Sequence, residues 1–226
     1  MANSLHPITI DGFLKPEMVR ALYQVLSVFS IPPGRIFVER LSLRDPDLLA
    51  KAISNHAPAA LVHFFSMYLC EIDRFLASTC EDHELIYGYE LWTTLAIDTT
   101  KATYFHVDND EVLRSRTSAV NEPLLGTILY VGPETCPASS GTLFYLADHI
   151  PHTVKEILCS HVDWGQLHHA TENLLTLIPF VPGRLVVFLG RHPHCTAPYS
   201  LEITGFPRVS LLVNAWLSPI SLSSLV

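Results

Sequence analysis

Several features that would assign this chain to a common class are missing from it. No run of Lys or Arg could follow a phosphate backbone, and the formal charge is −8, so we expect no nucleic-acid partner. The longest apolar stretch, residues 57–70, is interrupted by Pro58 and His63 and is too short to span a bilayer, so we expect no membrane partner. The first residues lack the basic and apolar regions of a signal peptide, which favours a cytoplasmic location.

Cysteine is present but not in a pattern that builds a scaffold. No C-x-x-C pair occurs, which argues against a zinc ribbon, and the scatter argues against a disulfide framework. The five cysteines are Cys70, Cys80, Cys136, Cys159 and Cys195. The chain is 49% hydrophobic and only 16% charged, which is typical of a folded globular protein. It shows neither a linker nor an internal repeat, so we expect a single domain over residues 1–226.

The first 90 residues have mainly helical patterns. Pro16 opens a segment with apolar residues on one stripe, which ends before Pro32. Asp45 is a candidate cap for a second, short helix through Ser54. Residues 58–79 form the longest predicted helix. We expect these helices to pack on the outside of a sheet.

From about residue 91 the pattern changes to short strands separated by turn residues. This predicts an antiparallel sandwich or jelly roll, and therefore a mainly β fold with N-terminal helices. Residues 148–173 carry five of the twelve histidines and are interpreted as an insertion near the mouth of the barrel. The expected strands are residues 91–97, 103–108, 124–131, 142–146, 174–180, 184–189 and 208–216.

One short motif in these strands is suited to metal binding. His106 and Asp108 are two positions apart in a predicted strand, so their side chains point to the same face. A second imidazole from a distant strand would complete a set of two histidines and one carboxylate. That set occupies one face of an octahedral Fe(II) ion and leaves three positions open. A His-x-Asp pair alone occurs by chance in many proteins, so the accompanying residues decide its meaning.

Two downstream features accompany the motif. His194 follows the strongly apolar segment 184–189, and Arg208 begins an alternating strand. A lone arginine entering an apolar strand needs an anion to justify its burial, and its planar fork suits a dicarboxylate. Ser210 lies two positions further on, faces the same way and can donate another hydrogen bond.

These residues resemble the Fe(II)/2-oxoglutarate-dependent dioxygenase superfamily, and within it the prolyl-hydroxylase-like branch. The match covers residues 91–217 in order and spacing. Its motifs are His106-Val107-Asp108-Asn109, Ser140-Gly141-Thr142-Leu143, Pro182-Gly183-Arg184-Leu185-Val186-Val187-Phe188 followed by His194, and Arg208-x-Ser210. The resemblance implies a double-stranded β-helix, a cupin-like jelly roll, packed against the N-terminal helices.

The resemblance also implies a ligand set and a reaction. His106, Asp108 and His194 would bind Fe(II), and Arg208 with Ser210 would hold the co-substrate 2-oxoglutarate. Dioxygen would then be used to oxidise an aliphatic C–H bond, with release of succinate and CO2. His192 competes with His194 as the distal ligand, and we favour His194 from its spacing to Ala197 and Pro198. Lys101 is a less favoured anchor for the anion.

Further contacts to 2-oxoglutarate are expected from hydroxyl groups near the motif. Tyr104 shares the strand face of His106 and is a candidate, although a core aromatic is an equally good interpretation. Thr127 and Tyr130 lie on a central strand and face opposite sides, so at most one of them serves; we include Thr127 in the expected site. The histidines of the insertion are interpreted as solvated or substrate-contacting residues rather than a second metal site.

A small substrate such as an amino acid or a biosynthetic intermediate is favoured, because no peptide-binding module is evident. Hydroxylation, desaturation and ring closure all remain open, as does the oligomeric state. Protein prolyl hydroxylation is the nearest alternative. A non-catalytic cupin-like binding protein would have no use for the Arg208–Ser210 pair. A cupin-type isomerase or hydrolase commonly adds a third His or a Glu to the first ligands.

Overall fold

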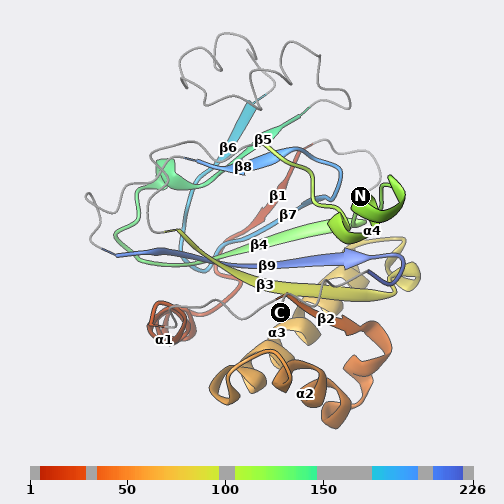
Figure 1. Ribbon diagram of the computed structural model, residues 1–226. Coiled ribbons are helices and arrows are strands. Elements are labelled where there is room, and N and C mark those ends of the chain that lie inside the picture. Colours follow the sequence, from red (N-terminus) through yellow and green to blue (C-terminus); the bar gives the residue numbers. More distant parts are fainter. Residues whose placement is uncertain (1–5, 29–34, 97–104, 147–174, 198–205, 221–226) are drawn as a thin grey trace.

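The computed structural model describes residues 6–28, 35–96, 105–146, 175–197 and 206–220. Its strands form two antiparallel sheets (Figure 1). The large sheet has the strand order β1-β7-β4-β9-β3-β2, and the small sheet has the order β6-β5-β8. The strands are β1 (Ile8–Ile10), β2 (Ile36–Glu39), β3 (Gly88–Ala96), β4 (Leu125–Gly132), β5 (Thr142–Tyr145), β6 (Leu175–Ile178), β7 (Leu185–Leu189), β8 (His194–Thr196) and β9 (Arg208–Trp216). The antiparallel two-sheet arrangement expected from the sequence is confirmed.

The helices pack beneath the large sheet, as expected (Figure 1). They are α1 (Pro16–Leu26), α2 (Pro46–Ser54) and α3 (Ala59–Thr79), with α4 (Glu111–Thr117) elsewhere and the short 3-10 turns η1 (Arg40–Arg44), η2 (His83–Leu85) and η3 (Ala138–Ser140). The Asp45 carboxylate accepts hydrogen bonds from the backbone N–H groups of Asp47 and Leu48, at 3.0 and 3.2 Å, and so caps α2. None of the described helices combines the length and apolar character that a bilayer span requires.

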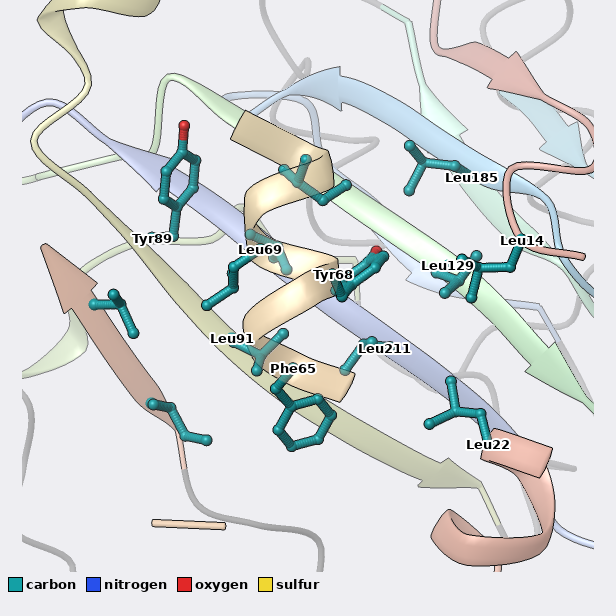
Figure 2. Packing of buried hydrophobic residues seen from close by; sticks show 14 of the residues in the cluster. Leu14, Leu22, Phe65, Tyr68, Leu69, Tyr89, Leu91, Leu129, Leu185 and Leu211 are labelled. Atoms are coloured by element: carbon teal, nitrogen blue, oxygen red, sulfur yellow. The ribbon is translucent and has the colours of Figure 1, made fainter. Parts of the chain in front are cut away.

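The large sheet is buried on both faces because α3 covers one and the small sheet covers the other. Figure 2 shows Tyr68 and Leu69 of α3 among Leu91, Leu129 and Leu211 of the strands. On the opposite face, Ile128 and Tyr130 of β4 pack with Phe144 of β5 and with Val186 and Phe188 of β7. Each fully buried side chain of this size stabilises the fold by about 1.5–3 kcal/mol. The side chains of β4 therefore alternate between two cores.

The structure differs from the sequence expectations in its shortest elements. Residues 1–90 are not only a helical support, because β1 and β2 form the two edges of the large sheet. The segment after Asp108 contains α4, which Asp110 caps by accepting a hydrogen bond from the Leu113 backbone N–H. Within the described part of the predicted strand 103–108, residues 105–108, the pairing consists of one isolated bridge at His106. The proposed 148–173 insertion lies outside the described residues.

Candidate metal centre

Two segments that are distant in sequence bring His106, Asp108 and His194 together. The backbone N–H of each histidine donates to the carbonyl of the other, at 3.0 and 2.9 Å, which joins the segment of His106 to β8. One potential ligand atom from each of the three residues lies within 4.8 Å of the others. The Nε2 atoms of both histidines are 3.8 Å from oxygens of Asp108. The arrangement matches the predicted set of two imidazoles and one carboxylate.

The ring of His194 is held in the orientation that a metal ligand needs. Its Nδ1–H donates to the backbone oxygen of His192, at 3.0 Å, so the Nε2 lone pair points toward Asp108. Burial lowers the pKa of His194, and the neighbouring His106 lowers it further against the opposing charge of Asp108. The neutral imidazole that results is the form that binds metals. Phe188 packs against this ring, with the centroids 4.8 Å apart.

Asp108 supplies an independent test of whether a cation fits. Its side chain is 9% exposed, and within the described part of the chain its Oδ2 atom has no hydrogen-bond partner. A buried carboxylate oxygen is unfavourable unless a cation or a donor satisfies it. Two histidines and one carboxylate with open positions are the donor set of mononuclear non-haem Fe(II) sites. The residues present therefore fit Fe(II).

Arg208 and Ser210 lie in the same pocket as the three ligands. The pocket has a volume of about 180 Å³ and opens between the two sheets. Arg208 is 4% exposed and donates from NH1 to the Gly141 carbonyl, at 3.1 Å. Its guanidinium carbon lies 5.7 and 5.2 Å from the ring centroids of Tyr130 and Phe180. The Ser210 hydroxyl is buried and makes no hydrogen bond within the described residues. This end of the pocket offers a positive charge and a hydroxyl to an anion.

The expectation that Thr127 contacts 2-oxoglutarate is wrong on geometry. Its hydroxyl donates to the backbone oxygen of Val213, at 3.0 Å, on the face of β4 that α3 covers. Of the two candidates, Tyr130 lies on the same face of β4 as the pocket-lining Ile128, and its hydroxyl donates to the Thr142 hydroxyl at 2.8 Å. Thr142 lines the pocket.

The remaining predicted residues can be placed only in part. Tyr104 and Lys101 lie outside the described residues. His192 is buried and orients His194 through its carbonyl, but it is not part of the converging group. Its role as an alternative ligand is therefore not supported by the geometry.

Sequence reasoning missed the opposite end of the pocket. Arg35 and Trp92 line it together with Leu212, whereas Thr94, which also lines the pocket, lies opposite Ser210. The guanidinium carbon of Arg35 lies 4.9 Å from the centroid of the Trp92 ring, and its NH1 donates to Glu90 at 2.9 Å. The alternation of Glu90, Trp92 and Thr94 along one strand was a usable signal for a shared face. Nothing in the sequence near Arg35 indicates that it reaches this strand.

Comparison with known proteins adds to this geometry. No protein-family model and no curated protein matches the chain. Solved structures do match. A prolyl-4-hydroxylase from Pseudomonas putida is 19% identical, with a TM-score of 0.53 over 93% of this chain and 84% of that chain. An oxidoreductase of the 2OG-Fe(II) oxygenase family from Burkholderia pseudomallei is 10% identical, with a TM-score of 0.53 over 96% and 88%. This chain has the fold of the 2OG-Fe(II) oxygenases.

A third match with this oxygenase fold is HygX from Streptomyces hygroscopicus, whose structure contains nickel and 2-oxoglutarate. It is 12% identical, with a TM-score of 0.53 over 93% of this chain and 81% of that chain. The shared feature in all three comparisons is the fold. The predicted jelly roll with supporting helices is therefore confirmed.

Proposed function

We propose that this chain is a non-haem Fe(II), 2-oxoglutarate-dependent oxygenase that oxidises an aliphatic C–H bond of a small substrate. Succinate and CO2 are the products formed from 2-oxoglutarate. The observation that carries the proposal is one pocket that contains His106, Asp108 and His194 together with the buried guanidinium of Arg208. The oxygenase fold supports the same assignment.

Different residues of the pocket would bind the metal and the co-substrate. His106, Asp108 and His194 would hold Fe(II), and Arg208 would pair with the distal carboxylate of 2-oxoglutarate. Ser210 would donate a hydrogen bond to the same carboxylate. The bound metal and co-substrate supply the oxidising chemistry, while the chain orients the reactants and limits water. The rings of Phe144 and Phe188 pack against that of His194, with centroids 5.7 and 4.8 Å away, and so help to fix this ligand in place.

Two rival functions fit less well. A non-catalytic cupin-like binding protein needs the metal ligands but not a buried arginine and serine beside them. A cupin-type isomerase or hydrolase commonly uses a further ligand, and within the described residues the converging group contains only the two histidines and Asp108. Prolyl hydroxylation remains the second candidate because one of the matched structures is a prolyl-4-hydroxylase.

The proposal is tested by adding Fe(II) and 2-oxoglutarate to the protein without oxygen. We expect a visible absorption band, and succinate formation once oxygen is admitted. Asp108→Ala should lose both signals. Arg208→Ala should need roughly 10- to 100-fold more 2-oxoglutarate, because it loses a charge-assisted pair.

Arg20→Ala is the matched control for Arg208→Ala. Arg20 is an exposed arginine paired with Glu134, at 3.5 Å, and it does not line the pocket. It should behave as the unmodified protein. An unmodified protein that gives neither the band nor succinate would contradict the oxygenase assignment.

A further inference from the structure

The pocket has a cation at each of its two ends. Arg208 begins β9 and pairs with Ala96 of β3, whereas Trp92 lies opposite Leu212. Trp92 and Ala96 are four positions apart, which corresponds to about 13 Å along a strand. Arg208 therefore serves one end of the pocket, and Arg35, stacked over Trp92, serves the other.

The environment of Arg35 fixes its guanidinium in place without enclosing it. The side chain of Glu90 is 2% exposed and accepts a hydrogen bond from NH1 of Arg35, while half of the Arg35 side chain remains exposed. The Trp92 ring supports the flat face of the guanidinium from 4.9 Å. Among the described residues, Arg35 makes no other hydrogen bond, ion pair or ring contact.

The geometry leaves one edge of the Arg35 guanidinium for a ligand. A guanidinium has five N–H donors, and NH1 is the nitrogen that Glu90 engages. The edge formed by Nε and NH2 can therefore make two parallel hydrogen bonds to a planar anion, which is the geometry that carboxylates prefer. A lysine could neutralise Glu90 as well but lacks this second edge.

We propose that Arg35 and Trp92 form the substrate subsite of this pocket and bind a carboxylate group of a small-molecule substrate. The assignment, which rests on the function proposed above, narrows the substrate class to carboxylic acids. The carboxyl of an internal proline is part of an amide, so a peptide could fill this subsite only through another acidic group. Arg35 would hold the carboxylate of the substrate, and Arg208 would hold 2-oxoglutarate. The three metal ligands line the same pocket.

The test measures binding at Arg35 itself. Protein labelled with ¹⁵N-arginine is saturated with Zn(II), a redox-inactive substitute for iron, and with 2-oxoglutarate, so that the first anion site is filled. Phenylacetate and its neutral counterpart phenylacetamide are then titrated. We expect the Nε–H resonance of Arg35 to shift saturably with the acid and not with the amide, while that of Arg20 stays unchanged.

Two substitutions separate binding from folding. Arg35→Met removes the charge, whereas Arg35→Lys retains a cationic partner for Glu90 and should preserve thermal stability. Both variants should bind phenylacetate about 10- to 100-fold more weakly, because each loses the bidentate pair. If Arg35→Met fails to fold, Arg35→Lys alone tests whether Arg35 binds the carboxylate.

The outcomes also separate this inference from the proposed function. The inference is overturned if phenylacetate produces no shift, if the amide binds as well as the acid, or if Arg35→Lys binds the acid as tightly as the unmodified protein. Failure of the proposed function is visible in a different measurement, as the absence of 2-oxoglutarate-dependent succinate formation by the unmodified protein.

Discussion

The segment His192-Pro193-His194 places two buried histidines next to the proposed metal site, and only one of them joins it. His192 contributes its backbone carbonyl, which accepts the Nδ1–H of His194. Loss of a hydrogen-bond partner behind a ligand typically costs about 10- to 100-fold in metal affinity, so loss of the ligand itself should cost at least as much. We predict that His194→Ala reduces Ni(II) affinity by at least about 100-fold, measured by titration calorimetry.

His192→Ala is the matched control for His194→Ala. It keeps the backbone carbonyl that orients His194, so its Ni(II) affinity should stay close to that of the unmodified protein. Because His192 is buried, with 3% of the residue exposed, the variant should lose some thermal stability. Equal Ni(II) affinities in the two variants would contradict the choice of His194 over His192.

At the scale of the elements, a single carboxylate connects α3 to the large sheet. Oδ1 of Asp73 accepts hydrogen bonds from Tyr89 of β3 at 2.6 Å, from His83 at 2.8 Å and from Arg40 at 3.1 Å. Burial alone raises the pKa of Asp73. The hydrogen bonds of Tyr89 and His83 and the charge of Arg40 outweigh burial and hold this pKa below its usual value. The ionised form therefore contributes to the stability of the fold.

We predict that Asp73→Asn lowers the free energy of unfolding by about 1.5–3 kcal/mol at pH 7. Because the carboxyl pKa is lower in the folded state than in the unfolded chain, its contribution is complete above the unfolded pKa of about 3.9. It is lost as the pH falls through the folded pKa. The difference between Asp73→Asn and the unmodified protein should therefore shrink as the pH falls below about 4, measured by urea denaturation.

Glu71→Gln provides the comparison for Asp73 on the same helix. Glu71 pairs with Arg74 one turn away, and both side chains are at least half exposed. Such exposed pairs contribute about 0–1 kcal/mol. Loss of stability in Glu71→Gln as large as in Asp73→Asn, or a pH-independent effect of Asp73→Asn, would contradict the role given to this network.

Over the whole molecule, the sequence was most informative where a signal repeats or is chemically distinctive. The helices α1, α2 and α3 begin within one residue of their predicted starts, because Pro16, Asp45 and Pro58 are strong local boundaries. Strands β1, β2 and β8 have three or four residues, which is too short for a period to be visible. Their pairing is decided by contacts between distant segments.

The difference between local signals and long-range contacts also explains which residues of the site could be predicted from the sequence. The His-x-Asp pair and Arg208 can be recognised from the local sequence. That they lie close to His194 was predicted only because the resemblance implied a jelly roll that brings these segments together. For β4, the alternation of side chains placed Thr127 and Tyr130 on opposite faces. It did not indicate which face is turned toward the pocket and which toward the helices. Every residue of this strand is buried, because helices cover one face and the small sheet covers the other, so hydrophobicity does not distinguish the faces. Arg35 reaches the pocket only through long-range packing.

The proposed ligands are also distant enough in sequence for metal binding to report on the folded state of the whole chain. Asp108 and His194 meet only when β8 pairs with the segment of His106, so an unfolded chain has no equivalent site. A ligand present at 100 times its Kd stabilises the folded state by about 2.7 kcal/mol. In a chain of this length, each kcal/mol raises Tm by about 2–4 °C. We predict that Ni(II) with 2-oxoglutarate raises Tm by about 5–10 °C, measured by differential scanning calorimetry. Asp108→Ala should show no comparable rise, and an equal rise in both proteins would mean that the metal binds elsewhere.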